Sequence, residues 1–247
     1  MQIHRVLCFL VGAVIFSILV LSQPALAGMI ADRQDRQVLT EEGASDGGII
    51  DRSPQVVIIA PDFSPFDRTA AATASAGSVS SSGRSHQRSR IDSLSMAAAG
   101  ELAIGAGAGE IRADTGANAG TYNVFQVFFT VDSPHAFSLT TSYYGSLIGD
   151  GIGRVDGWVY FASVGGSSLL DRRLESDTGD SVTITGTLMP ARYQLLAEFS
   201  LGSVLAPRQG GASFSGTAGY DVLLVVPEPS GLLLAGIGSL WIMRRRR

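Results

Sequence analysis

Apolar and polar side chains alternate with a period of two along most of residues 120–226. In Tyr122–Val131, for example, Phe125, Val127 and Phe129 fall on one face of an extended chain. Similar alternation occurs at 136–144, 157–164, 181–188, 193–201 and 220–226. The same region holds 14 of the 19 aromatic residues of the 247-residue chain. Because a period of two is the period of a strand, we expect β-sheets packed around an aromatic core.

Clusters of Asp, Gly and Pro separate the predicted strands. Asp132-Ser133-Pro134, Gly165-Gly166 and Asp177–Asp180 predict turns, and the glycine-rich segment 145–157 predicts a loop. Six or more strands at this spacing are typical of two packed antiparallel sheets. The predicted fold class is therefore all-β, an antiparallel, jelly-roll-like β-sandwich. An N-terminal signal helix and a short C-terminal apolar helix are expected to flank it.

Residues 54–119 are rich in Ala, Gly and Ser, which supply 26 of the 42 residues between Thr69 and Glu110. This composition fits a flexible linker, but single hydrophobic residues at even spacing also fit flat strands packed on a sheet. Val56–Ile59, between two prolines, is a candidate short strand or edge contact. We predict one sandwich domain over 54–226, with this segment joined to the aromatic-rich core at 120–226.

Arg84, His86, Arg88 and Arg90 occupy every second position, so on a strand they would share one face. Such a row could contact an anionic polymer or could be an ordinary solvated face. The chain has no lysine. Residues 28–226 hold 13 arginines and 21 acidic residues, a net charge of −8, which argues against nucleic acid as a partner. The mixed polar segment 28–53 predicts a solvated linker.

The N-terminus has the pattern of a secretory signal peptide over residues 1–27. His4 and Arg5 precede an apolar run from Val6 to Leu21, and Ala25 and Ala27 form an A-x-A site for signal peptidase. An uncleaved membrane anchor is the alternative. The only cysteine, Cys8, lies inside the apolar run, so the exported part has no disulfide or thiol chemistry.

The C-terminus combines three features in order. Pro227-Glu228-Pro229 precedes an apolar segment at 231–243, and Arg244, Arg245, Arg246 and Arg247 end the chain. Thirteen helical residues span only about 20 Å, less than the ~30 Å hydrocarbon core of a bilayer. The arginines would stop this end at the cytoplasmic face. We therefore expect a transmembrane helix at 231–243 that holds the protein only transiently.

This C-terminal arrangement resembles the PEP-CTERM sorting signal over residues 227–247. The resemblance implies a substrate of exosortase in a Gram-negative bacterium, typically one that makes exopolysaccharide. It implies cleavage at or near Pro227-Glu228-Pro229 and transfer to the cell surface or the extracellular space. The signal occurs on many unrelated domains, so it leaves the activity of residues 28–226 open.

Motifs for catalysis or metal binding are missing from the sequence. The exported part has two histidines, His86 and His135, too few for a zinc site, and we expect His135 in an exposed turn. A glycan hydrolase would need two converging carboxylates, and turn residues are the simpler interpretation of all the candidates. Those candidates are Asp150, Asp156, Asp171, Glu175, Asp177 and Asp180. We expect no enzyme activity, no cofactor and no metal, with calcium at Gly149–Gly151 or Asp177–Asp180 as the one open alternative.

Aromatic side chains that point outward could stack on sugar rings. Tyr143 and Tyr144 are adjacent, so on a strand one of them faces the solvent, and Trp158 is a candidate if it does not belong to the core. The leading hypothesis is an exported, exosortase-processed protein with a structural or adhesive role in an exopolysaccharide matrix. A carbohydrate-binding module with a specific glycan site is the alternative, and a glycan hydrolase is a third.

Overall fold

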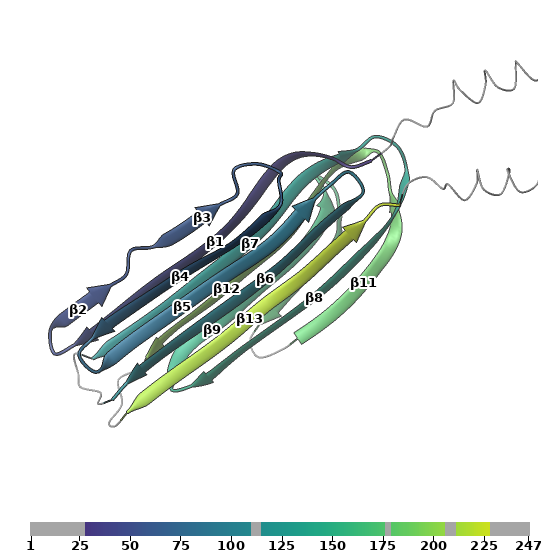
Figure 1. The fold of residues 1–247 in the computed structure, drawn as a ribbon. Helices are drawn as coiled ribbons and strands as arrows, with labels where there is room; N and C mark the ends of the chain where they lie inside the picture. The colour runs from purple at the N-terminus through teal and green to yellow at the C-terminus, as the bar shows by residue number, and fades with distance from the viewer. Residues whose placement is uncertain (1–27, 110–114, 176–178, 206–210, 228–247) are drawn as a thin grey trace, which may run out of the picture. The chain divides into compact units, whose positions relative to one another are not determined.

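Thirteen strands of the described residues form two antiparallel layers (Figure 1). The structure is a computed structural model that describes residues 28–109, 115–175, 179–205 and 211–227. The sandwich comprises Met29–Pro227. No helix of the length and apolarity needed to cross a membrane occurs in the described ranges. The predicted β-sandwich is confirmed, while the two predicted flanking helices lie outside these residues.

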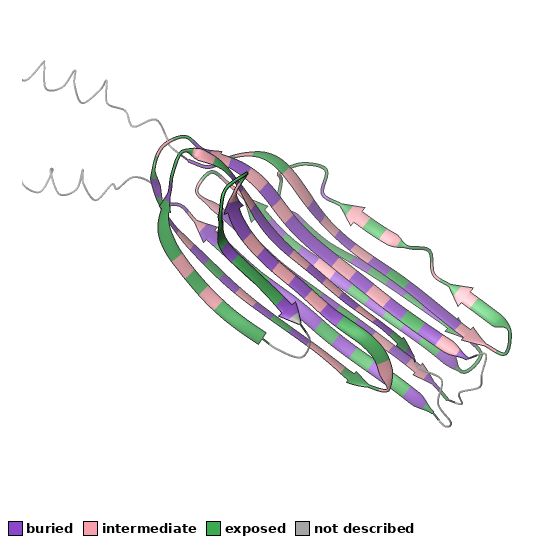
Figure 2. Ribbon diagram, turned by 180° about the vertical axis from the view of Figure 1, so that it is seen from behind, coloured by how far each residue is buried: buried purple, intermediate pink, exposed green. Residues whose placement is uncertain are grey.

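Each layer has a simple strand order. Sheet A contains, from one edge to the other, β10 (Ser168–Glu175), β9 (Gly151–Ser163), β12 (Ala191–Leu205), β7 (Gly116–Val131), β1 (Ile30–Asp46) and β2 (Ile49–Arg52), and β3 (Val56–Ile59) also pairs with β1. Sheet B contains β11 (Gly179–Leu188), β8 (His135–Gly149), β13 (Ala212–Val225), β6 (Ser95–Ala108), β5 (Val79–Ile91) and β4 (Phe66–Ala76). Along most strands, buried and more exposed residues alternate (Figure 2).

The last eight strands have jelly-roll topology. β9 pairs with β10, β8 with β11, β7 with β12 and β6 with β13, as if one long hairpin were wrapped around the core. The resulting orders, β10-β9-β12-β7 and β11-β8-β13-β6, are those of the two jelly-roll sheets. The first five strands extend this framework, because β1 continues sheet A beside β7 and β5 and β4 continue sheet B beside β6.

The prediction of a polar linker over 28–53 is wrong. Residues 30–46 form the strand β1, which pairs with β7 along nearly its whole length. The sequence of β1 looks like a solvated segment because three of its inward residues, Arg36, Thr40 and Glu42, are polar and yet fully buried. The core thus includes hydrogen-bonded polar groups, which remove the apolar alternation by which a strand is recognised.

Most strand predictions agree with the structure. The segments at 122–131, 136–144, 181–188, 193–201 and 56–59 all lie in strands, and the Ala/Gly/Ser-rich segment forms β4, β5 and β6 rather than a linker. The loop predicted at 145–157 is wrong, since β8 and β9 continue through it to a tight turn at Gly149 and Asp150. Gly149 has a φ of 112°, a conformation that glycine adopts most easily.

Aromatic rings fill the jelly-roll half of the interior. Phe129, Phe161 and Tyr193 lie with ring centroids 5.6–6.3 Å apart, and Phe137 meets Phe161 edge to face at 5.6 Å. Each of these positions faces inward from its strand and is buried. Aromatic pairs at such distances stabilise a core beyond the burial of their area alone. The aromatic-rich region is therefore the core predicted from the sequence.

Glycines on β5 and β6 leave room for polar side chains, from β1 of the opposite sheet at Gly83 and from the paired strand β13 of the same sheet at Gly100. A Cβ atom at Gly83 would collide with Oε1 of Glu42, and one at Gly100 would collide with the ring of Tyr220. Thr40 Oγ1 donates to Glu42 Oε1 at 3.2 Å. Burial raises the pKa of Glu42 to about 7, although the hydrogen bond from Thr40 favours the carboxylate.

A buried hydrogen-bond network joins both sheets. Gln87 Nε2 on β5 donates to Asn123 Oδ1 at 2.7 Å and to Tyr220 Oη at 2.9 Å. Tyr220 Oη donates to Asn123 Oδ1 at 2.8 Å, and Asn123 Nδ2 donates to the carbonyl of His86 at 2.7 Å. All three side chains of the network are at most 2% exposed. Replacing one of these side chains should leave the remaining two with buried polar atoms that lack a hydrogen-bond partner.

Arg36 is the largest fully buried side chain among the described residues. Its guanidinium donates to Ser89 Oγ at 3.2 Å, to the carbonyl of Ser64 at 3.0 Å and to the carbonyl of Asp62, and it lies 5.7 Å from the ring centre of Phe66. Burial lowers its pKa, while the nearby Asp62 carboxylate opposes that effect. Backbone carbonyls thus hold this charge at the junction of β1 with the segment before β4.

The Tyr220 network yields a stability prediction. Tyr220→Phe keeps the ring but removes the hydroxyl that Gln87 and Asn123 contact, so we expect a loss of about 1–3 kcal/mol in the free energy of unfolding. Urea denaturation measures this loss. Tyr144→Phe, at an exposed tyrosine, is the control and should change the free energy of unfolding little. Equal effects of the two changes would contradict the network's role.

Glu42 yields a pH prediction. Its pKa rises from 4.5 to about 7 on folding, so the folded chain binds the extra proton and the free energy of unfolding falls as pH rises through this window. We expect Glu42→Gln to remove that fall. The difference in the free energy of unfolding between Glu42→Gln and the wild type should therefore be more favourable to the variant at pH 8 than at pH 5, by up to about 3 kcal/mol. Denaturation at both pH values measures it, with the exposed Glu101→Gln as control. A fall that persists unchanged in Glu42→Gln would contradict the assignment.

Candidate functional site

The three predicted glycan-contact residues lie in three different parts of the sandwich. Tyr143 is 7% exposed, packs against Phe199 in the core and donates to Asp180 Oδ2 at 3.3 Å. Tyr144, 48% exposed, lies on the outer face of sheet B. Trp158 lies half-buried on the outer face of sheet A. The expectation that one of the two tyrosines faces outward is confirmed, but the structure does not bring the three residues together.

Trp158 is held in a defined orientation by residues of the edge strand β10. Its Nε1 donates to Asp171 Oδ1 at 2.9 Å, and the guanidinium carbon of Arg173, directly opposite on β10, lies 4.9 Å from its ring centre. Tyr160, two residues along the same strand, has its ring centre 5.2 Å away at 47°. The site therefore combines two aromatic rings with charged groups of both signs, a geometry suited to contact with a polar ring that has apolar faces.

A hollow of about 270 Å³ lies beside Trp158. Arg154, Asp156 and Trp158 from β9, Arg173 from β10, and Glu198 and Ser200 from β12 line it. Arg154 Nε lies 2.5 Å from Asp156 Oδ1. Burial and the Glu198 carboxylate both raise the pKa of Tyr122, whose hydroxyl donates to Glu198. Tyr122 thereby stays a donor that fixes the Glu198 carboxylate at the edge of the hollow.

A second, shallower hollow of about 570 Å³ shares Arg154 with the first. Its floor includes Gly120 and Gly202, which are paired across β7 and β12. Ile152 and Val204 rise at its far side, 73% and 54% exposed. We call the two hollows, with Trp158 and Tyr160, the Trp158 face. It is an open strip along the outer side of sheet A that can accept an extended ligand.

Sequence reasoning missed most polar members of this face. Arg173 and Asp171 meet Trp158 only because β10 pairs with β9, and no strand was predicted at 168–175. Glu198 reaches the hollow because β12 lies on the other side of β9. The alternation of Asp171 and Arg173 in an otherwise short segment was the one available signal for this strand. The local sequence of β9 does not reveal that β10 and β12 are its neighbours in the sheet.

The candidate hydrolase carboxylates do not gather at one site. Asp156 and Asp171 lie on the outer side of sheet A, Asp150 lies in the β8–β9 turn and Asp180 lies on the edge strand β11. Asp177 and the Glu175 side chain fall outside the described residues. No cluster of three metal-ligating side chains occurs in the parts of the chain that the structure describes. His135, expected in an exposed turn, is instead buried at the start of β8, with Nε2 3.0 Å from Ser133 Oγ.

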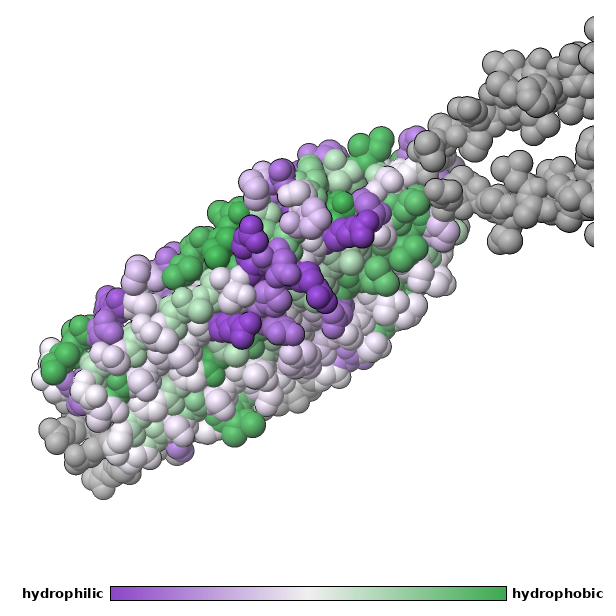
Figure 3. All heavy atoms as spheres, in the orientation of Figure 1, coloured by the Kyte–Doolittle hydropathy of each residue, from purple (hydrophilic) through white to green (hydrophobic). Residues whose placement is uncertain are grey.

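Sheet B also has a groove on its outer face, of about 640 Å³, with Arg88 and Arg90 on one side and Asp221 and Leu223 on the other. Strongly hydrophilic residues gather on this face, which β4, β5, β6 and β13 form (Figure 3). The alternation of Arg84, His86, Arg88 and Arg90 on this face of β5 is confirmed. The groove thus lies between a basic strand and an acidic residue of β13.

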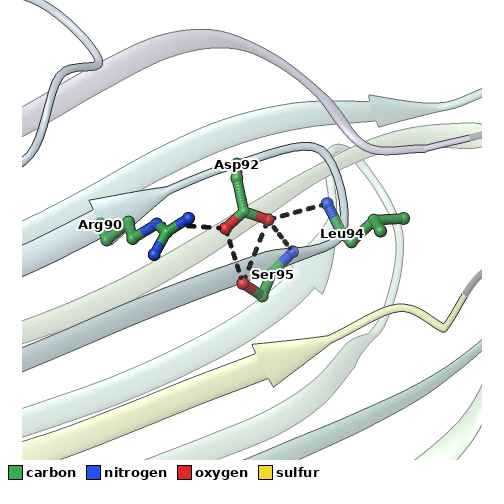
Figure 4. Close-up of polar contacts among 4 residues, drawn as sticks. All are labelled: Arg90, Asp92, Leu94 and Ser95. Atoms are coloured by element: carbon green, nitrogen blue, oxygen red, sulfur yellow. Dashed lines mark hydrogen bonds and ion pairs between the residues drawn. The ribbon is translucent and has the colours of Figure 1, made fainter.

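Neighbouring carboxylates partly neutralise the basic row. His86 Nε2 lies 2.8 Å from Asp67 Oδ1, and Arg90 Nε lies 3.5 Å from Asp92 Oδ2 (Figure 4). Partial burial opposes ionisation of Asp92, but hydrogen bonds from Leu94 and Ser95 outweigh it and hold its pKa below the ordinary value. This pairing favours the solvated-face interpretation of the row over a dedicated site for an anionic polymer.

The predicted sorting and processing residues lie at or beyond the limits of the described chain. Pro227 is exposed and directly follows the last strand and Val226. Glu228, Pro229, the terminal residues Arg244, Arg245, Arg246 and Arg247, and the signal peptidase residues Ala25 and Ala27 lie outside the described residues. The predicted cleavage motif therefore starts at the last described residue of the sandwich.

Comparison with known proteins gives no family. No protein-family model matches the chain, and no curated protein matches it. Among solved structures, TmCBM61 in complex with beta-1,4-galactotriose matches at 11% identity over 51% of this chain and 70% of that chain, with a TM-score of 0.24. The enzymatically active domain of bacteriophage CBA120 tailspike protein 4 matches at 11% identity over 64% of this chain and 19% of that chain, with a TM-score of 0.21. Eiger TNF from S. frugiperda matches at 12% identity over 42% and 68%, with a TM-score of 0.20. At these values the similarities assign no function.

Proposed function

We propose that this chain is an exported protein of a Gram-negative bacterium, and that its β-sandwich is a structural or adhesive element at the cell surface or in an exopolysaccharide matrix. Signal peptidase would remove residues 1–27, and an exosortase would process the chain near Pro227-Glu228-Pro229. The apolar segment 231–243 and the terminal arginines would hold the protein in the inner membrane until then. The sandwich would contact polysaccharide through the Trp158 face.

The sorting proposal is supported by the position of the motif as well as its sequence. A peptidase or transpeptidase must bind its substrate in an accessible, extended form. Val226, directly after β13, donates its N–H to the carbonyl of Leu94 at 2.8 Å, and Pro227 is exposed. Cleavage after this point would leave every hydrogen bond of β13 intact.

The paired Trp158 and Tyr160 rings carry the glycan part of the proposal. Sugar rings present apolar C–H faces to aromatic rings and hydroxyl groups to charged side chains. At the Trp158 face, Asp156 and Glu198 can accept hydrogen bonds from hydroxyls, and Arg154 and Arg173 can donate them. A carbohydrate-binding module with one specific glycan is the alternative, which selectivity among polysaccharides would distinguish from general adhesion.

The glycan contact is tested with the purified full chain and the producing organism's own exopolysaccharide. We expect saturable binding that Trp158→Ala weakens about tenfold or more, equivalent to ~1.4 kcal/mol, because the central ring is lost. Tyr144→Ala, an exposed aromatic on the other sheet, should leave the dissociation constant unchanged. Calorimetry with and without calcium also tests the alternative metal sites at Asp150 and Asp180. Equal binding by the wild type and Trp158→Ala would refute the site.

The sorting motif is tested in the producing cell. Replacing Pro227, Glu228 and Pro229 together by alanine should block processing, because the recognised sequence is lost. We expect the cell-associated product to retain Arg244–Arg247, whereas the wild-type product should lack them. Mass spectrometry of the C-terminal peptide measures this difference. Wild-type protein that keeps its terminal arginines would identify the chain as a permanent membrane protein instead.

A further inference from the structure

The edge strands of the two sheets differ in how they are protected. A strand at the edge of a sheet presents unpaired N–H and C=O groups that can pair with another chain. In sheet A, β10 carries Asp171, Arg172 and Arg173, and β2 and β3 at the opposite edge have only four residues each. Charges and short length are the usual means by which proteins prevent edge pairing. Sheet A is therefore protected at both edges.

In sheet B, one edge is protected and the other is not. β4 carries Asp67 and Arg68, and near its other end the N–H of Ser75 already donates to Asp51 Oδ2 of β2 at 2.7 Å. At the opposite edge, β11 has no charge and no proline over Ser181–Leu188. Among the described strands, β11 pairs only with β8. No described strand pairs with the outward N–H and C=O groups of Ser181–Leu188, so these groups can pair with a further strand.

The composition of β11 favours addition of a further strand. Val182, Thr183, Ile184 and Thr185 are β-branched and have high β-propensity. Val182 and Ile184 point to the inner side, where they pack at the margin of the core and remain half-buried. A neighbouring strand would complete the burial of these two side chains and satisfy the outward backbone groups at the same time.

We propose that a second copy of this chain pairs with β11 in antiparallel orientation, about a two-fold axis through Thr183. In this register Val182 faces the partner's Ile184, Ser181 faces the partner's Thr185, and Thr183 faces the partner's Thr183. Asp180 meets the partner's Gly186, so no like charges are opposed. A two-fold axis requires a self-complementary strand, and the order Ser-Val-Thr-Ile-Thr matches β-branched or hydroxyl residues at each pair.

Charge supports a second copy as the occupant. Residues 28–226 carry a net charge of −8, so two copies repel each other over most of their surfaces. The uncharged stretch Ser181–Leu188 is where two such bodies can approach at low electrostatic cost. The stretch offers no carboxylate to attract a basic peptide. One strand pair is a small interface, so we expect dimers that depend on concentration, as in a crowded matrix.

The test compares two threonines that are hydrogen-bonded to each other. Thr183 Oγ1 on β11 and Thr140 Oγ1 on β8 lie 3.2 Å apart, and both residues are exposed. Thr183→Lys and Thr140→Lys lose the same hydrogen bond and add the same charge to the same face, but only Thr183 is on the edge strand. In sedimentation velocity of the full chain over a concentration series, we expect Thr183→Lys to weaken dimerisation at least tenfold relative to Thr140→Lys. Equal dimerisation of the two variants, or a wild type that stays monomeric to millimolar concentration, would overturn the proposal.

Disulfide trapping tests the register. In a Cys8→Ser background, Thr183→Cys would be the only cysteine and would face its own copy across the two-fold axis. Thr140→Cys lies one strand further in, so its copies would be about 14 Å apart, beyond the reach of a disulfide. We expect covalent dimers from Thr183→Cys alone after mild oxidation. Covalent dimers from neither variant, or equally from both, would refute the pairing. Thr183→Lys should keep its binding to exopolysaccharide, so failure of this proposal and failure of the glycan proposal are distinguishable.

Discussion

Each of the two sheets contributes one layer of inward side chains to the interior. Every inward residue must therefore fit the side chains that surround it, from the opposite sheet and from neighbouring strands. This constraint explains the unusual composition of the chain. Where β1 directs Glu42 and Thr40 inward, β5 offers the bare backbone of Gly83. On β6, Gly100 leaves room both for the ring of Tyr220 on the paired strand β13 and for the amide of Asn123 from the opposite sheet. The inward positions of β4–β6 are mostly Ala, Gly and Ser because the large side chains that lie against them need this volume.

The same constraint decides what could be predicted from the sequence. Strands whose inward residues are aromatic or β-branched, such as those around Phe129 and Phe199, were recognised because burial and apolar character coincide there. β1 was not recognised because Arg36, Thr40 and Glu42 are buried through hydrogen bonds that partners far along the chain provide. A solvated segment and a strand with a polar inner face look alike until those partners are known. Local pattern therefore predicted the fold class but not the full extent of the sheets.

The candidate site shows a similar division. Because side chains alternate along a strand, the sequence predicted Tyr143 and Tyr144 on opposite faces, and the structure agrees. This alternation does not tell which outward residues of different strands become neighbours. Trp158 meets Arg173 and Glu198 because β9 lies between β10 and β12, an order set by wrapping the long jelly-roll hairpin. The site is thus a product of topology, whereas the edge strand β11 is unprotected because of its own composition.

β13 leaves the sandwich at Pro227 from the middle of its sheet. It pairs with β6 along Ala212–Val225 and with β8 along Phe214–Val225, so hydrogen bonds flank it on both sides. A tension applied at Pro227 along the strand would load both ladders in shear, and their bonds would share the force rather than break one after another. An edge strand pulled in the same direction would have only one ladder of hydrogen bonds to carry the force. If the chain is attached at this end, its sandwich is joined to the point of attachment through a strand that is hydrogen-bonded on both sides.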